Sequence, residues 1–135
     1  MTANQSPAQE TILVVEDDVL VRMPIAQYLR DCGYKVIEAV NADEAMTVLL
    51  HQETVVDVVF SAIDMSGSTD GFGLSKWVRE HRPGLDVILT GTVPRAVNAA
   101  KALCDDGPIP KPYEPQAVHD QIRRLLAARN ATRHK

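Results

Sequence analysis

The stretch that decides the fold is VVFSAIDMSG, residues 58–67. It opens with an apolar run of β-branched and aromatic residues, which is typical of a buried strand. The small residues Ser61 and Ala62 end the run, and Asp64 leads into a loop that contains Gly67. In open α/β sheets, ligands bind beyond the carboxyl ends of the strands. We therefore predict a buried strand followed by a functional loop.

Similar apolar runs alternate with helical patterns along the whole chain. We predict strands at 11–16, 34–39, 55–62, 85–90 and 108–111, and helices at 19–32, 42–51, 72–81, 94–104 and 115–129. This alternation implies a parallel sheet with helices on both faces. Because crossover connections are right-handed, few topologies remain. We predict an α/β flavodoxin-like (βα)5 fold with five strands in the order 2-1-3-4-5.

Single residues mark several element boundaries. Asp18 and Asn41 are suited to cap the helices that follow them, and Gly33 suits the left-handed residue after a helix. Pro24 removes a helical hydrogen bond, so we expect a kink or a loosened first turn there. The prolines within 108–111 place that strand at a sheet edge.

Composition indicates one globular domain of 135 residues with a formal net charge of −4. That charge argues against nucleic acid as the main ligand. No apolar run is long enough to cross a membrane, and the start lacks a secretory signal, so we expect a cytoplasmic protein. We predict a disordered segment at 1–10, the domain at 11–129 and a basic tail at 130–135. Cys32 and Cys104 lack metal-ligand spacing and are expected to be buried free thiols.

Polar side chains follow four of the predicted strands. They are Glu16, Asp17 and Asp18 after the first, Asp64 after the third, Thr90 at the end of the fourth and Lys111 at the end of the fifth. Carboxylates suit Mg²⁺, a lysine suits a phosphate, and a threonine hydroxyl donates to a phosphoryl oxygen. The carboxyl edge of the sheet is therefore the predicted functional site.

Four stretches, ILVVEDD (12–18), VDVVFSAIDMSGSTDG (56–71), VILTG (87–91) and PKPY (110–113), give a family resemblance. In this order and spacing the chain resembles the receiver domain of bacterial two-component response regulators, over about residues 10–129. The resemblance implies that Glu16, Asp17 and the backbone carbonyl of Asp64 hold Mg²⁺. It implies that Thr90 and Lys111 contact the phosphoryl group, and that the Lys111–Pro112 peptide bond is cis.

Two positions depart from the family pattern. Ala62 stands where the family has its phosphoacceptor aspartate, and Pro108 stands where it has a switch aromatic. A methyl group cannot attack a phosphoryl donor or ligate a metal. We therefore predict a receiver-like module that is not an enzyme, is not phosphorylated at position 62, and binds Mg²⁺ weakly or not at all. Without an acceptor, Lys111 could simply be a counter-charge for the acidic residues, and Thr90 a strand-end residue of high β propensity.

The expected partners are a histidine kinase or a histidine phosphotransfer protein, and a second copy of the chain through residues 94–129. No nucleic acid or membrane is expected as a partner. Three alternatives stay open: an ordinary Mg²⁺-dependent receiver whose aspartate at position 62 was replaced deliberately, an acceptor role for Asp64, and a small α/β hydrolase. The hydrolase is disfavoured because a nucleophile is missing at position 62.

Overall fold

The computed structural model describes residues 9–51, 53–91 and 109–133, with side chains in the last range up to residue 129. Five parallel strands form one sheet in the order β2-β1-β3-β4-β5, which confirms the predicted order. The strands are β1 Thr11–Val15, β2 Lys35–Ala39, β3 Val58–Ala62, β4 Asp86–Gly91 and β5 Ile109–Pro110. The helices of the described part are α1 Val19–Asp31, α2 Ala42–Leu50, α3 Gly71–His81 and α5 Pro115–Arg133.

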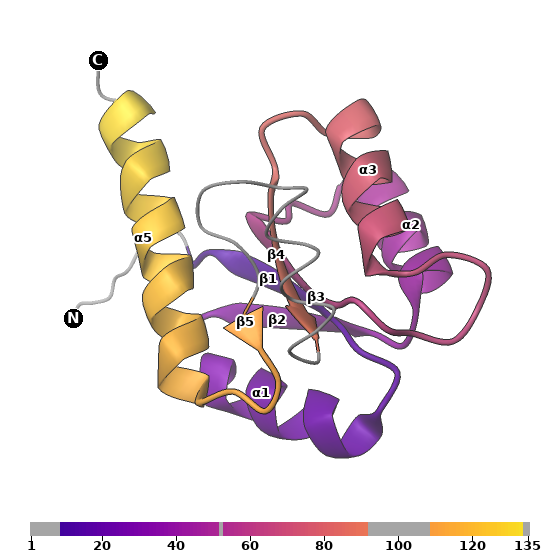
Figure 1. Ribbon diagram of the computed structural model, residues 1–135. Helices are drawn as coiled ribbons and strands as arrows, with labels where there is room; N and C mark the ends of the chain where they lie inside the picture. The colour runs from indigo at the N-terminus through magenta and orange to yellow at the C-terminus, as the bar shows by residue number, and fades with distance from the viewer. Residues whose placement is uncertain (1–8, 52, 92–108, 134–135) are drawn as a thin grey trace.

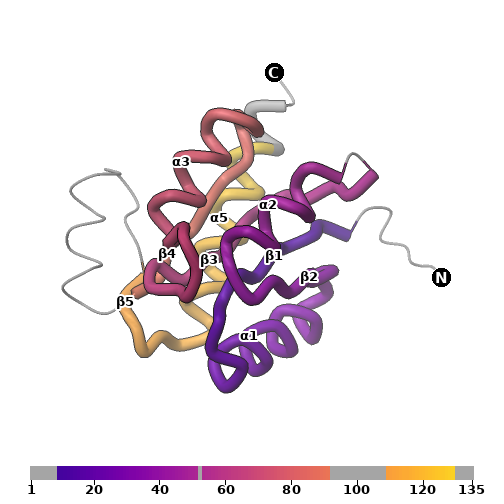
Figure 2. Tube along the Cα trace, turned by 90° about the vertical axis from the view of Figure 1, so that its right-hand side faces the viewer, coloured from indigo at the N-terminus to yellow at the C-terminus, as the bar shows by residue number. Residues whose placement is uncertain are grey.

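The sheet is covered on both faces, as the near-continuous apolar strands predict. Alternate residues of β1 and β3 face opposite ways. Ile12, Val14 and Phe60 pack against α1 and α5, whereas Leu13 and Val59 pack against α2 and α3. Figure 1 shows α1 and α5 on one side of the strands and α2 and α3 on the other. In Figure 2, α2 and α3 lie in front of the sheet and α5 behind it.

The helix ends follow the predicted signals. The Asp18 carboxylate accepts a hydrogen bond from the backbone N–H of Leu20 at 3.0 Å, and the Asn41 side chain accepts one from Glu44 at 2.8 Å. Gly33 has φ 104° just after α1, the left-handed conformation that glycine adopts at little cost. Helix α1 runs through Pro24 without interruption, and its first turn is closed by bonds to the Asp18 carbonyl.

Several predicted boundaries differ from the observed ones. Strand β3 begins at Val58 rather than at residue 55. The Asp57 N–H and carboxylate both bond to the Thr11 backbone, and the residues before Asp57 do not pair with β1. Helix α5 continues to Arg133, through most of the predicted basic tail. Gln9 and Glu10, predicted to be disordered, bond to Gly33 and Lys35.

Other predictions concern residues outside the described part of the chain, or cysteine burial. The predicted helix at 94–104, Pro108 and Cys104 lie outside the described residues. Cys32 was predicted to be buried and is exposed at the carboxyl end of α1. Among the described residues, no helix is long and apolar enough to span a bilayer.

Candidate functional site

The adjacent strands β1, β3, β4 and β5 each carry one of the candidate side chains at the carboxyl edge of the sheet, and these side chains lie on the same face. Glu16 and Lys111 continue β1 and β5 by one residue, through backbone bonds to Ala39 and Gly91. Ala62 is the last residue of β3, Thr90 is the residue before the last of β4, and the two are register partners. The residues two positions earlier all belong to the core under α1 and α5: Val14, Phe60, Ile88 and Ile109. Because side chains alternate along a strand, the four end residues face the same side.

Lys111 and Glu16 form an ion pair across this edge. The Lys111 Nζ lies 2.6 Å from Glu16 Oε1, and the other carboxylate oxygen accepts the Asp18 backbone N–H at 3.1 Å. Glu16 is only 4% exposed. Since β3 and β4 lie between β1 and β5, the pair spans the strand ends that carry Ala62 and Thr90. The sequence-based reading of Lys111 as a counter-charge therefore matches the contact that it makes.

The other two acidic residues are directed differently. Asp17 is exposed, and its Oδ2 accepts the backbone N–H of Ser66 at 2.8 Å, which ties the loop after β3 to β1. Asp64 is also exposed, two residues beyond the end of β3. Within the described ranges, no group of three or more His, Cys, Asp and Glu residues is placed to hold a metal ion. The set expected from the resemblance, the Glu16 and Asp17 carboxylates with the Asp64 backbone carbonyl, therefore stays a prediction.

Ala62 itself is 1% exposed and closely surrounded. Its carbonyl accepts the Ser61 hydroxyl at 2.9 Å. The Gly71 N–H donates to the Ile63 carbonyl at 2.8 Å, and a Cβ on Gly71 would clash with the Ala62 carbonyl. The amino end of α3 therefore lies directly against the backbone at the end of β3.

The Thr90 hydroxyl has no hydrogen-bond partner among the described residues. Thr90 is 1% exposed. A buried polar atom left unpaired costs about 1–3 kcal/mol. Thr90 therefore retains a donor at a small cost in stability, beside Ala62.

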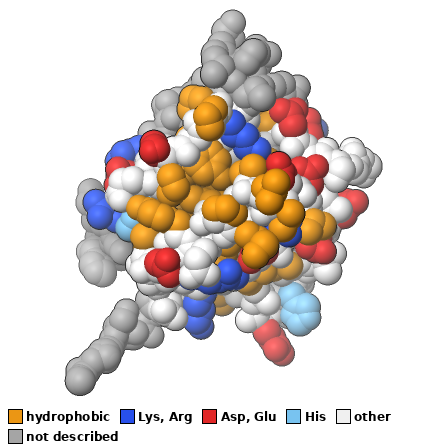
Figure 3. Space-filling model, turned by 90° about the horizontal axis from the view of Figure 1, so that it is seen from below, with side chains coloured by type: hydrophobic (Ala, Val, Ile, Leu, Met, Phe, Trp, Pro, Cys, Tyr) orange, Lys and Arg blue, Asp and Glu red, His pale blue; other side chains and the backbone are white. Residues whose placement is uncertain are grey.

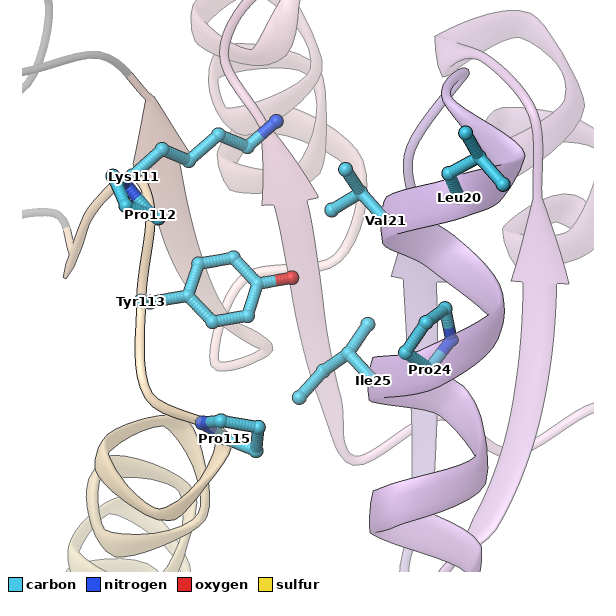
Figure 4. Close-up of a pocket in the computed structure, with 8 residues that line it drawn as sticks. All are labelled: Leu20, Val21, Pro24, Ile25, Lys111, Pro112, Tyr113 and Pro115. Atoms are coloured by element: carbon cyan, nitrogen blue, oxygen red, sulfur yellow. The ribbon is translucent and has the colours of Figure 1, made fainter.

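Beside this edge lies an apolar groove of about 440 Å³ between α1 and the segment that joins β5 to α5. Figure 4 shows its two walls facing each other. The lining residues are Leu20, Val21, Pro24, Ile25, Lys111, Pro112, Tyr113 and Pro115. Figure 3, seen from below, shows that apolar side chains gather on the side where α1 lies. Leu20 and Met23 are 81% and 58% exposed.

Tyr113 was not singled out from the sequence, although it belongs to the PKPY stretch. Its ring meets Phe60 edge to face, with centroids 5.5 Å apart. Figure 4 shows its hydroxyl directed from the β5 side toward α1. Burial, and then the negative charge of Glu16, raise the pKa of the phenol well above its usual range. Tyr113 therefore presents a neutral hydroxyl in an apolar setting. The cis peptide bond expected at Lys111–Pro112 is present beside it.

Comparisons with known proteins agree with this geometry. Transcriptional regulatory protein ResD of Bacillus subtilis is 32% identical over 123 residues, which cover 90% of this chain and 50% of that protein. Probable transcriptional regulator ycf27 of Guillardia theta is 31% identical over 124 residues, covering 90% and 47%. The chain thus spans about half the length of these relatives.

Among solved structures, a receiver domain protein (CheY-like) of Methanospirillum hungatei superposes with a TM-score of 0.80 at 23% identity, covering 93% of this chain and 99% of that one. The receiver domain of NtrX from Brucella abortus gives 0.77 at 28% identity, covering 86% and 98%. The family description "Response regulator receiver domain" matches residues 12–123. The chain therefore belongs to the response regulator receiver domain family, the signalling modules of two-component systems.

Proposed function

We propose that this receiver domain signals through protein contacts and takes no phosphoryl group at position 62. The observation that supports this most directly is Ala62, which ends β3 between Glu16, the residue after β1, and Thr90 on β4. The edge residues expected around an acceptor are present, and the side chain between them is a methyl group. A methyl group offers no lone pair to a phosphoryl donor.

Asp64 is a poor substitute for an acceptor. It is exposed, whereas Glu16, Ala62 and Thr90 are buried. It follows the end of β3 by two residues, beyond the strand end that Ala62 occupies. Covalent capture needs the attacking oxygen within a few tenths of an ångström of its productive position. This proposal therefore assigns no acceptor role to Asp64.

Incubation with acetyl phosphate and Mg²⁺, followed by intact-mass measurement, tests the proposal. We expect no phosphoryl adduct on this protein, and an adduct on the Ala62→Asp variant. Ala62→Asn, which has nearly the same size but no nucleophilic carboxylate, is the control and should stay unmodified. An adduct on the unaltered protein, mapped to Asp64, would contradict the proposal. A phosphoryl adduct on Ala62→Asp is expected whether Ala62 is natural or replaces an aspartate deliberately.

Mg²⁺ binding is proposed to be weak or absent. Glu16 is engaged by Lys111, and Asp17 is engaged by the Ser66 N–H. Because Mg²⁺ demands near-ideal octahedral geometry, two engaged carboxylates are a poor site for it. The domain is thus expected to work without the ion.

The proposed partner is a histidine kinase or a histidine phosphotransfer protein. The exposed Leu20 and Met23 of α1, next to the groove, give such a partner an apolar surface to bury. A partner that docks here would lie beside the strand-end edge without needing chemistry at Ala62.

Two further expectations belong to this proposal. A homodimer through residues 94–129 would use α5 together with residues outside the described ranges, and sedimentation of the protein at increasing concentration tests it. The expected absence of nucleic-acid binding concerns these 135 residues, whose net charge is −4. The relatives named as transcriptional regulators are about twice as long as the matched segment.

A further inference from the structure

We propose that Lys111 serves as a built-in cation at the acidic edge, and that its ammonium group excludes a divalent metal from Glu16. The inference rests on the proposed function, because it requires an edge without an acceptor carboxylate. In this chain the Lys111 ammonium group would neutralise the Glu16 carboxylate without a metal ion.

The first argument is reach. The strands β5 and β1 are separated by β4 and β3, which puts their backbones about 14 Å apart at the usual strand spacing. The Lys111 and Glu16 side chains nevertheless meet at 2.6 Å, above the ends of the two strands between them. A carboxylate at position 62 would stand one strand nearer to Lys111 and would attract the ammonium first. Ala62 leaves that path open.

The second argument is charge. The Glu16 side chain is 6% exposed and that of Lys111 is 25% exposed. A carboxylate this deeply buried needs an opposite charge close by, either a metal ion or a basic side chain. Here the ammonium provides it, and the Asp18 N–H occupies the other oxygen. A metal ion at Glu16 would therefore have to displace the ammonium.

The third argument is the remaining ligands. Asp17 accepts the Ser66 N–H, so it holds the loop after β3 rather than joining Glu16 around an ion. A divalent cation bound to Glu16 would also be repelled by the Lys111 ammonium group, which lies 2.6 Å from the same carboxylate. Lys111, rather than the missing carboxylate alone, is thus the group that keeps the metal out.

Manganese binding without any phosphodonor tests the inference. Mn²⁺ is titrated into the unaltered protein, into Lys111→Met and into Lys76→Met, and bound ion is measured from the loss of the free Mn²⁺ EPR signal. Lys76 is an exposed residue of α3 and serves as the matched control. We expect Lys111→Met to bind Mn²⁺ at least about tenfold more tightly than the other two proteins, because the opposing charge is gone.

A second variant keeps the lysine. In Ala62→Asp the ammonium is expected to turn to the new carboxylate and release Glu16, so Mg²⁺ should raise the unfolding temperature of this variant and leave that of the unaltered protein unchanged. Equal Mn²⁺ affinity in the unaltered protein and folded Lys111→Met overturns the inference. If Lys111→Met does not fold, Mg²⁺ stabilisation of the unaltered protein overturns it instead. The proposed function fails separately, through a phosphoryl adduct on the unaltered protein.

Discussion

At the scale of single residues, the edge of the sheet combines satisfied and unsatisfied polar groups. Ser61 is fully buried and its hydroxyl bonds to the Ala62 carbonyl, whereas the equally buried Thr90 hydroxyl has no partner among the described residues. The two hydroxyls sit on neighbouring strands, one register step apart. They form a natural pair for comparing the cost of an unpaired group with the gain from a paired one.

We expect Thr90→Val to raise the free energy of unfolding by up to about 1 kcal/mol, because it removes an unpaired buried hydroxyl at nearly constant volume. Ser61→Ala, the control, should lower it by about 1 kcal/mol because a formed hydrogen bond is lost. Urea denaturation measures both. A Thr90→Val protein that is less stable than the unaltered one would show that the hydroxyl has a partner in solution.

Ala62→Asp tests charge at the same edge. In this variant three carboxylates, at positions 16, 17 and 62, would lie near the single ammonium group of Lys111. Because these negative charges repel one another, we expect the free energy of unfolding in a chelator to fall by about 1–2 kcal/mol. Ala62→Asn separates the effect of size from that of charge, which matters because Ala62 is only 1% exposed. Chemical denaturation in EDTA gives the comparison, and equal stability of the Asp and Asn variants would refute the charge argument.

The sequence predicts which residues lie at this edge, but it does not predict their contacts. Strand alternation suffices to bring Glu16, Thr90 and Lys111 together, because strand ends are visible in the apolar pattern. The direction of Asp17 depends on the backbone of the loop around Ser66, which no local pattern encodes. Tyr113 was missed because a ring after two prolines carries no periodic signal, and its role is set by Phe60, far away in sequence.

At the scale of elements, the ends of the strands opposite the site carry their own polar cluster. Arg129 of α5 donates to the Asp57 carbonyl at 2.9 Å and lies 3.6 Å from its carboxylate. Asp86 opens β4 beside Val58 in the register. Burial raises the pKa of the Asp86 carboxyl, and Arg129 partly opposes that rise. The end of α5 is thus fixed to the sheet by charge as well as by its apolar face.

Asp86→Asn is expected to stabilise the domain at neutral pH. Because the folded state raises this pKa, the folded protein holds the proton more tightly, and stability is lost as pH rises above the ordinary value of 3.8. The asparagine variant lacks this loss, so its advantage should be present near pH 7 and vanish below pH 3.8. Thermal unfolding across pH measures it. Glu80→Gln on the surface of α3 controls for the lost charge, and an advantage that is independent of pH would contradict the assignment.

Elements were predictable where a periodic pattern and a boundary residue agree. Asp18, Asn41 and Gly33 marked helix ends correctly because capping is local. The start of β3 was predicted three residues early, because Val55 and Val56 continue the apolar run while the long-range bonds between Asp57 and Thr11 decide where pairing begins. Helix α5 extended beyond its prediction because nothing after residue 129 breaks a helix.

At the scale of the whole molecule, the strand-end edge and the apolar groove lie side by side. Lys111 belongs to both, since its stem lines the groove while its ammonium pairs with Glu16. Sequence patterns predicted the edge and missed the groove, because the groove forms only where α1 meets the segment that precedes α5. A partner that binds in the groove would therefore contact Lys111, the residue that pairs with Glu16 at the strand-end edge.

Leu20→Glu should weaken docking of the proposed partner without unfolding the domain, because the side chain is 81% exposed. Leu50→Glu, at the end of α2 and 65% exposed, is the matched control and should bind normally. Biolayer interferometry against histidine kinase phosphotransfer domains selects a binder for the unaltered protein, and the variants are then compared on it. We expect at least about a tenfold loss for Leu20→Glu alone. Unchanged affinity would place the docking surface elsewhere.

Asp57 contacts one residue near each end of the described chain: its carboxylate accepts the Thr11 N–H at 2.8 Å, and its carbonyl accepts a hydrogen bond from Arg129 at 2.9 Å. Both contacts lie at the amino ends of the strands, opposite the edge that carries Lys111. A fluorophore, an affinity handle or a sensor-chip linkage attached beside these contacts would leave the groove facing freely into the buffer.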